Sequence, residues 1–393
     1  MNTRNLTLEQ KQFFAGLLEI VCQKLEITPT QYQTAEQRYS AVGKWLSDSP
    51  IPALANASIY PQGSTRIQTT VRPIERNEFD VDLVCHLPSA QRMLPSAVRD
   101  TVGARLREHG NYREMLKPLN RGWRLDYANE FHMDITPAIN DPGHANGGVL
   151  VPDHELTDWK ESNPRGYAAW FEEIAKQGPR FLLEQCFVRD DVEPLPDQER
   201  FKGTLRRTIQ ILKRHRDIYF SKKPENQRKD APISIIITTL AAHAYRDCIT
   251  ANHYNNEMDL LMDIVENMTR YIKLEKTTNA GSLLWIVNPT NAKENFAEKW
   301  NAHPERIAAF DEWHQAVSSD LDMIGAKQGL DSIGAGLAQM LGDTVSKQLL
   351  TEYATRINEI RKRSSLAVAA SGLIGTEISR PAVPVPKNTF YGE

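Results

Sequence analysis

The residues most able to do chemistry are Asp80 and Asp82, which lie two positions apart in the segment Glu78–Val84. Side chains at positions i and i+2 of a β-strand point to the same face, so both carboxylates would leave one side of a strand together. Carboxylates this close repel each other unless a cation lies between them. Mg²⁺ prefers such oxygen ligands and is usually held by one or two carboxylates together with substrate phosphates. The pair therefore predicts a metal site.

A glycine–serine turn, Gly63 and Ser64, precedes the two aspartates. Glycine lets the backbone approach a ligand closely, and backbone N–H groups together with the serine hydroxyl can face phosphates. Either motif alone is more often a turn or a solvated strand edge. Their order along the chain, with apolar residues around the aspartates, instead predicts a metal-dependent enzyme that acts on a nucleoside triphosphate.

A third aspartate, Asp134, lies between apolar residues on a second predicted strand. A half-buried carboxylate in the middle of a strand is costly unless it is paired or bound to a metal. We therefore expect Asp80, Asp82 and Asp134 to hold two Mg²⁺ ions, with Mn²⁺ as an alternative. His132 shares the face of Asp134, and we interpret it as a hydrogen-bonded histidine at the sheet edge.

The predicted reaction follows from these ligands. One ion, on Asp80 and Asp82, would hold the triphosphate, and the other, at Asp134, would lower the pKa of an attacking hydroxyl. Paired ions about 4 Å apart stabilise both the attacking and the leaving oxygen of an in-line displacement. The products would be a phosphodiester and pyrophosphate, and Asp134 could also accept the proton of the hydroxyl.

The elements that must position these residues follow from hydrophobic spacing and turn signals. In the first part of the chain we expect helices over 6–25, 34–46 and 92–109, and strands over 58–60, 78–86, 122–127 and 130–137. The last two strands form a hairpin that turns at 128–129, and 139–163 is expected to be loop. The rest is expected to be helical, over 202–220, 233–247, 256–274, 292–321 and 344–362.

This pattern divides the chain into three parts. Residues 1–165 would form an α/β core with N-terminal helices, residues 166–365 a helical domain, and residues 366–393 an extended and flexible C-terminal tail. On the helix over 202–220, Lys202, Arg206 and Lys213 lie beside an apolar stripe. They could reach into a cleft or be surface side chains. Ser234 could contact a phosphate or cap the following helix.

Composition excludes several classes of protein. The 393 residues include 47 Lys and Arg against 50 Asp and Glu, a net charge of −3, which argues against a long nucleic acid as a stable partner. The four cysteines are far apart, so disulfides and a zinc site are not expected, in keeping with a reducing cytoplasm. The sequence shows no signal peptide, and its longest apolar run, 233–245, is too short to span a membrane and predicts a buried helix.

The sequence resembles the bacterial cGAS/DncV-like nucleotidyltransferases, or CD-NTases, of the polymerase-β-like superfamily. Gln62-Gly63-Ser64, Asp80-Val81-Asp82 and Asp134 match the superfamily signature. The segments similar to the CD-NTases themselves extend from about residue 60 to 300, and comprise residues 61–66, 78–84, 133–137, 162–167, 211–217, 233–240, 288–289 and 294–296. The clade that makes purine cyclic trinucleotides is the most similar.

The resemblance implies an α+β fold, with a nucleotidyltransferase core, a C-terminal helical domain and the active site in the cleft between them. It implies that ATP, with GTP, is joined into a cyclic di- or trinucleotide that a separate effector reads in anti-phage (CBASS) signalling. Asp80, Asp82 and Asp134 would bind Mg²⁺, and Gln62, Ser64, Lys213 and Ser234 would contact the donor nucleotide beside Gly63. In some members a ubiquitin-like conjugation enzyme acts on the C-terminal tail, which here ends in Glu393.

Two other functions are compatible with the motifs. A different nucleotidyltransferase would add nucleotides to RNA ends or transfer AMP to a macromolecule, although the acidic balance of the chain argues against an RNA groove. A non-catalytic nucleotide-binding protein would keep the fold, although all three aspartates are present.

Overall fold

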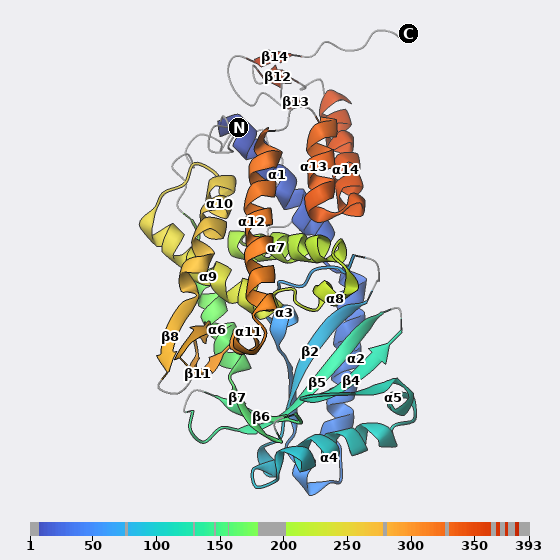
Figure 1. Ribbon diagram of the computed structural model, residues 1–393. Coiled ribbons are helices and arrows are strands. Elements are labelled where there is room, and N and C mark those ends of the chain that lie inside the picture. The colour runs from blue at the N-terminus through green and yellow to red at the C-terminus, as the bar shows by residue number, and fades with distance from the viewer. Residues whose placement is uncertain are drawn as a thin grey trace.

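The computed structural model describes residues 8–74, 78–128, 130–144, 147–155, 157–179, 202–277, 281–326, 330–362, 367–369, 374–375 and 382–384. A mixed sheet with helices on one side forms one half of the molecule, and helices form most of the other half (Figure 1). This arrangement confirms the predicted α+β class.

The sheet has seven strands, five of which lie in the order β1-β2-β5-β4-β3. Only the central pair, β2 and β5, is parallel. Apolar and polar side chains alternate along β2, so that Phe79, Val81 and Leu83 are buried while Asp80 and Asp82 face the other side. The five strands are β1 (Ser58–Pro61), β2 (Phe79–His86), β3 (Leu116–Leu119), β4 (Gly122–Tyr127) and β5 (Phe131–Asn140).

Two long helices, α2 (Pro29–Ser47) and α4 (Pro95–Glu108), cover the apolar face of this sheet. Their buried residues, among them Val42 and Val102, belong to one hydrophobic cluster with the apolar side chains of β2, β4 and β5. The face that carries the aspartates is therefore the face that these helices leave free. The short helices α3 (Gly63–Arg66) and α5 (Gly110–Met115) lie before β2 and β3.

The predicted hairpin is confirmed, because β4 and β5 pair in antiparallel register around residues 128–130. The prediction of a loop over 139–163 is wrong. The structure places a second hairpin there, β6 (Val149–Asp153) and β7 (Asp158–Ser162), and β6 pairs with the end of β5. Pro142 and three glycines precede β6, and Pro152 lies inside it, so the composition of this segment hid the short strands.

The second half packs around the buried helices α7 (Thr204–Ser221) and α9 (Ser234–Ala251). The predicted buried helix over 233–245 is confirmed by α9. Its neighbours are α6 (Pro164–Ala175), α8 (Glu225–Arg228), α10 (Glu257–Asn267), α11 (Glu298–Ala302), α12 (Glu305–Ala326), α13 (Leu330–Leu341) and α14 (Asp343–Lys362). Of these, α6, α8 and α13 have no counterpart among the predicted helices.

Short strands interrupt the helical half, which the sequence did not predict. They form two hairpins, β8 (Lys273–Thr277) with β9 (Gly281–Trp285), and β10 (Val287–Asn288) with β11 (Asn291–Asn295). The expectation of one helix over 292–321 is therefore wrong at its start. Asparagines favour turns here. The side-chain oxygens of Asn288, Asn291 and Asn295 each accept a hydrogen bond from the backbone N–H two residues further on.

The first helix, α1 (Leu8–Leu25), differs from its predicted grouping. Its buried residues, including Phe14, Leu17 and Val21, pack in the hydrophobic cluster of α7, α9, α10 and α14, whereas α2 packs with the sheet. The chain therefore builds part of the helical half first, crosses to the sheet and returns. At the other end, β12 (Ala367–Ala369) pairs with β13 (Ile374–Gly375) and β14 (Ala382–Pro384), so these pieces of the tail are extended. Among the described residues, no helix is long and apolar enough to cross a membrane.

Candidate active site

Strands β2 and β5 bring the predicted aspartates together. In their parallel register Asp82 lies directly beside Asp134, and Asp80 lies beside His132. Adjacent strands are separated by about 4.8 Å, so the hydrogen bonds of the sheet fix the distance between the backbones that carry these side chains. The side chains differ in exposure, at 61% for Asp80 and 19% for Asp134. Asp80 is thus open to solvent, whereas Asp134 is largely enclosed.

The glycine–serine turn lies against Asp82. The backbone N–H of Gln62 donates to the carbonyl of Asp82 at 2.8 Å, and α3 begins at the next residue. Gly63 has a φ of +58°, which L-residues with side chains rarely adopt, and a Cβ at this position would lie 2.6 Å from Oδ2 of Asp82. Only glycine fits between the turn and the carboxylate. This contact places Gln62, Gly63 and Ser64 next to the aspartate cluster.

Asp82 is the aspartate with the most perturbed ionisation. Burial, followed by the charges of Asp134 and Asp80, raises its pKa from 3.8 to about 7. Lys213 and Arg124 act in the opposite direction but do not compensate. A carboxylate whose ionised form is destabilised by its neighbours is typical of a site that receives a cation.

Helix α7 approaches the cluster through the segment that follows α3. The ammonium of Lys213 donates to the carbonyl of Thr69 at 2.9 Å, and Gln210 donates to the carbonyl of Thr70. Thr70 in turn donates to the hydroxyl of Ser64 at 3.3 Å. Lys213 is only 5% exposed, and burial, followed by the charge of Arg216, lowers its pKa to about 7. Lys213 is therefore buried near Asp82, and the surface-lysine interpretation is wrong.

The other two cations of this helix and Ser234 have different surroundings. Lys202 pairs with Glu26 at 3.1 Å, and Arg206 pairs with Glu172 at 2.7 Å, so both serve packing between helices. Ser234 is the first residue of α9 and accepts a hydrogen bond from Arg216 at 3.1 Å. The N-cap of α9 is Ile233, so Ser234 is not the capping residue.

Two residues next to the aspartates, Arg124 and His132, make further polar contacts. Arg124, on β4, forms a bidentate ion pair with Asp134, at 2.6 and 2.8 Å, and was not predicted as a site residue. The predicted hairpin did not reveal it, because a turn at 128–129 would pair Arg124 with Met133, whereas the observed register pairs it with Asp134. His132 lies 3.1 Å from Asp126, 3.4 Å from Glu78 and 3.6 Å from Asp80, as expected of a hydrogen-bonded histidine.

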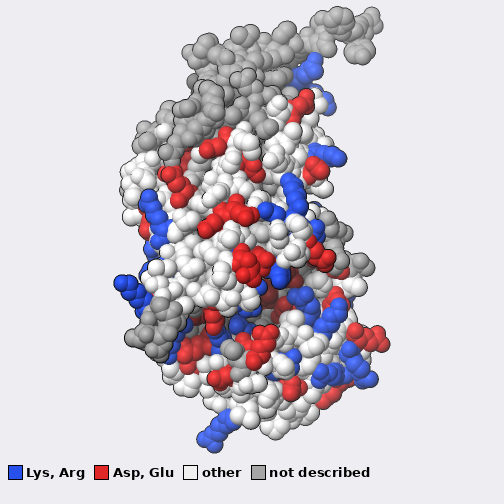
Figure 2. All heavy atoms as spheres, in the orientation of Figure 1, with Lys and Arg blue, Asp and Glu red and all other residues white. Residues whose placement is uncertain are grey.

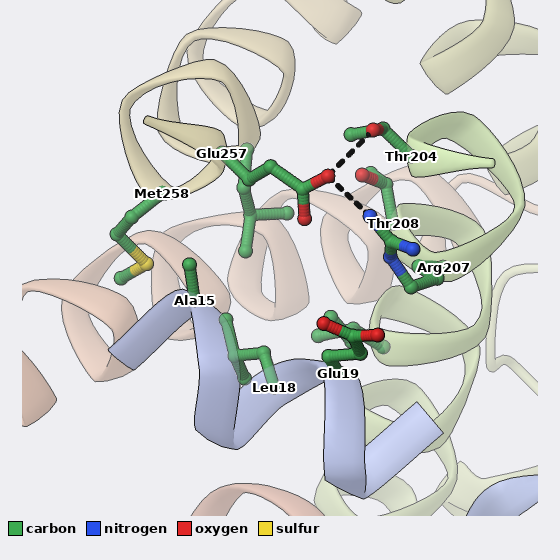
Figure 3. A pocket seen from close by; sticks show the side chains of 10 residues that line it. Ala15, Leu18, Glu19, Thr204, Arg207, Thr208, Glu257 and Met258 are labelled. Atoms are coloured by element: carbon green, nitrogen blue, oxygen red, sulfur yellow. Dashed lines mark hydrogen bonds and ion pairs between the residues drawn. The ribbon is translucent and has the colours of Figure 1, made fainter. Parts of the chain in front are cut away.

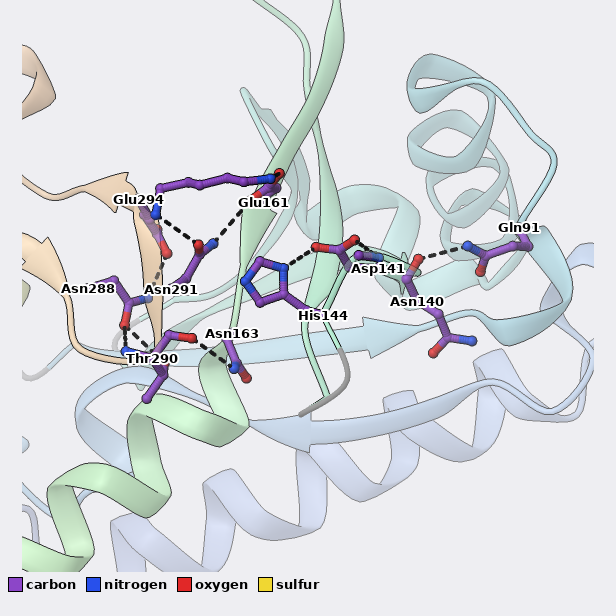
Figure 4. A network of polar contacts seen from close by, with 12 residues as sticks. Gln91, Asn140, Asp141, His144, Glu161, Asn163, Asn288, Thr290, Asn291 and Glu294 are labelled. Atoms are coloured by element: carbon purple, nitrogen blue, oxygen red, sulfur yellow. Dashed lines mark hydrogen bonds and ion pairs between the residues drawn. The ribbon is translucent and has the colours of Figure 1, made fainter. Parts of the chain in front are cut away.

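Two other sets of polar side chains lie close together, and one of them includes His132 beside Asp80. Within the described part of the chain, two sets of three side chains have ligand atoms within 4.8 Å of one another: Glu78, Asp126 and His132, and Asp141, His144 and Glu161. The three predicted aspartates do not form such a set. Figure 4 shows the second set beside a network in which Asn291 and Lys293 of β11 donate to Glu161 of β7. This network joins the sheet to the helical half.

A pocket between α1, α7 and α10 contains none of the predicted site residues (Figure 3). Glu257 crosses it to accept hydrogen bonds from Thr204, at 2.9 Å, and from Arg207. Ala15, Leu18 and Met258 form its apolar wall. Glu257 and Arg207 are paired with each other, so this pocket is a packing contact between helices.

Comparison with known proteins identifies the family. Residues 16–174, which span the turn and all three aspartates, match the Second Messenger Oligonucleotide or Dinucleotide Synthetase (SMODS) domain. A c-di-GMP synthase from Roseivirga ehrenbergii is 29% identical over 398 residues, which cover 99% of this chain and all of that protein. Residues 16–174 are a SMODS domain, and the whole chain resembles the bacterial CD-NTases. The protein is a nucleotidyltransferase that synthesises a cyclic oligonucleotide.

Two further relatives show how widely the likeness extends among CD-NTases. A cyclic AMP-AMP-AMP synthase from Acinetobacter sp. is 31% identical over 150 residues, 37% of this chain and 42% of that protein. The solved structure of the CD-NTase CdnG from Bradyrhizobium diazoefficiens, in complex with GTP, superposes with a TM-score of 0.66. At 21% identity it covers 86% of this chain and 98% of its own, which shows that the two proteins share the fold.

Proposed function

We propose that this protein condenses two molecules of GTP into c-di-GMP. The observation that carries the base and ring size is the full-length match to a c-di-GMP synthase, whereas the synthase of a cyclic trinucleotide matches only about a third of the chain. This favours a dinucleotide over the trinucleotide that the sequence suggested. A mixed product of ATP and GTP is the second candidate.

The aspartates suit a pair of divalent ions, Mg²⁺ in preference to Mn²⁺ on the chemistry of the donors. Asp80, Asp82 and Asp134 offer only carboxylate oxygens, the ligands that Mg²⁺ prefers. Burial, followed by repulsion from Asp134 and Asp80, raises the pKa of Asp82, and cations at this place would stabilise its ionised form. When bound, such ions supply positive charge for the attacking and leaving oxygens of phosphoryl transfer.

The protein's own groups would bind and orient the donor nucleotide. Gly63 and Ser64 place backbone N–H groups and a hydroxyl next to Asp82, where a triphosphate could lie. Lys213 has donated one of its three N–H groups to Thr69, which leaves two for phosphate oxygens. Gln62 adjoins the turn, and Ser234 contacts Arg216, three residues along α7 from Lys213. Asp134, beside Asp82, could accept the proton of the attacking ribose hydroxyl.

The proposal extends to the cell. We place the enzyme in the cytoplasm, with its product read by a separate effector during anti-phage defence. The C-terminal tail would be the segment on which a ubiquitin-like conjugation enzyme acts. These parts rest on the family alone, and Glu393 lies outside the described residues.

Product analysis tests this function. The protein is incubated with Mg²⁺ and with GTP, ATP, both, or CTP and UTP, then treated with phosphatase and analysed by mass. We expect a phosphatase-resistant product with the mass of c-di-GMP from GTP alone. Asp80→Asn and Asp82→Asn should abolish it, while Asp100→Asn, the same change on the exposed side of α4, should leave it intact. A trimeric mass, or a product that requires RNA, would overturn the proposal.

A further inference from the structure

Arg124 and Asp134 lie directly opposite each other on β4 and β5, so their side chains share the face that carries the aspartate cluster. Both carboxylate oxygens of Asp134 accept from the guanidinium, at 2.6 Å from Nε and 2.8 Å from Nη2. A bidentate pair of this kind fixes a carboxylate in orientation as well as in place. Asp134 is therefore held by a cation that belongs to the protein.

The same guanidinium also faces a second aspartate. Its Nη2 lies 3.6 Å from Oδ1 of Asp80, and its positive charge lowers the pKa of Asp82. Arg124 is thus the only residue of the described chain recorded in ion pairs with two of the three aspartates. The neighbouring cation, Lys213, is buried and bonded to the backbone of Thr69. One arginine side chain thus supplies part of the positive charge that the three carboxylates need.

This charge opposes the arrival of a divalent ion. A doubly charged ion bound at Asp134 would lie within a few ångströms of the guanidinium, where like charges repel strongly in a half-buried site. The three aspartates, moreover, do not converge within 4.8 Å of one another. The guanidinium is 29% exposed, so it has an exit toward solvent, where the negative charge of a triphosphate could receive it.

We infer that Arg124 is a positioning residue that acts through Asp134: it takes the place of a cation when the site holds no nucleotide, and so makes binding of a divalent ion at Asp134 depend on nucleotide. The inference rests on the proposed two-ion site. It gives the enzyme an order of assembly, with the ion at Asp134 bound together with the triphosphate and not before it.

Counting bound Mn²⁺ tests the inference without requiring turnover. The spin-resonance signal of free Mn²⁺ is followed as protein is added, with and without a GTP analogue whose α–β bridge cannot be cleaved. Wild type should bind its second Mn²⁺ only when the analogue is present. Arg124→Gln should bind it without analogue, with at least about tenfold higher affinity than wild type, because the competing charge is gone. Arg124→Lys keeps the charge without the bidentate geometry and should fall between them.

Lys117→Gln is the matched control. Lys117 lies opposite Arg124 on β3 and pairs with Asp126, so its loss removes one positive charge without touching the cluster. It should behave as wild type, and Asp134→Asn should lose the second ion in every condition. If Arg124→Gln binds the second ion no more tightly than Lys117→Gln, the inference is wrong while the two-ion site stands. If wild type binds no second ion even with the analogue, both fail.

Discussion

Asp82 and Lys213 are two buried groups whose pKa values are shifted in opposite directions, in each case toward the neutral form. The pKa of Asp82 is raised from 3.8 to about 7, and that of Lys213 is lowered from 10.5 to about 7. In both cases burial is the largest cause, so each group becomes easier to neutralise near neutral pH. Without ligands, the charged forms of Asp82 and Lys213 therefore destabilise the folded protein. Ligands that favour these charged forms should stabilise it.

For Asp82 the sign of the pH dependence is fixed. Between pH 4 and 7 the folded protein binds more protons than the unfolded chain, so without metal the free energy of unfolding should fall as the pH rises through this range. Asp82→Asn cannot ionise and should flatten the decline. Thermal unfolding in a chelator at several pH values checks this. A slope equal in wild type and Asp82→Asn would contradict the assignment.

For Lys213 we expect a proton to be taken up when the nucleotide binds. Its lowered pKa leaves much of it neutral at pH 8, and a bound triphosphate favours the charged form, so binding should take up a proton. Calorimetry of a GTP analogue in buffers of different ionisation enthalpy measures that uptake. Lys213→Ala should abolish the uptake and weaken binding roughly tenfold or more, since a hydrogen bond to a charged group contributes about 1.5–3 kcal/mol. Unchanged affinity and uptake would place Lys213 outside the nucleotide site.

At the scale of elements, the junction between β7 and α6 holds the two halves together. Asn163 is 2% exposed and caps α6 by accepting from the N–H of Gly166 at 2.9 Å, and its amide reaches the carbonyl of Thr290 at 3.5 Å. Close by, Glu161 accepts from Asn291 and Lys293 (Figure 4). One short polar segment thus begins a helix and also contacts the β10–β11 hairpin.

Asn163→Ala should therefore destabilise the protein by about 0.5–2 kcal/mol, the usual effect of losing an N-cap. Chemical unfolding of the purified variant measures the change. Asn163→Ser keeps an oxygen that can cap the helix and should recover most of the loss. Equal destabilisation by alanine and serine would show that the contact with Thr290, and not the cap, is the important one.

The sequence predicted the elements that have strong local signals. The β4–β5 hairpin, the buried helix α9 and the alternation around Asp80 and Asp82 follow from hydrophobic spacing, and the structure has them. The β6–β7 hairpin was not predicted because its strands are short and follow Gly143, Gly147 and Gly148. Arg124 was not predicted as a site residue because only the register of β4 against β5 places it beside Asp134, and that register is a tertiary property. The burial of Lys213 likewise depends on the contact between α7 and residues 69–70, which no local pattern encodes.

At the scale of the whole molecule, positive and negative charges are nearly balanced. Lys and Arg side chains are interspersed with Asp and Glu over the face shown in Figure 2, in keeping with a net charge of −3. Proteins that hold long nucleic acids need a continuous basic surface to displace counterions. The distribution of charge on this face suits a small substrate that is bound at a few specific residues.

We therefore expect no stable complex with duplex DNA or RNA at physiological salt. A mobility-shift titration with labelled duplexes of both kinds measures binding, and product formation with and without them measures activation. Product yield from GTP should be unchanged by either polymer. A shift at low protein concentration, or a product that appears only with a polymer present, would contradict this reading of the charge distribution.

The two hydrophobic clusters have a consequence for how such enzymes diversify. Asp80, Asp82 and Asp134 stand on strands of one cluster, whereas Lys213 and Ser234 stand on helices of the other. Substitutions that reshape the helices can accumulate without moving the carboxylates, whose spacing is held by backbone hydrogen bonds. The reaction can thus be inherited intact while the choice of nucleotide drifts, and a lineage can acquire a new signal without inventing a new catalyst.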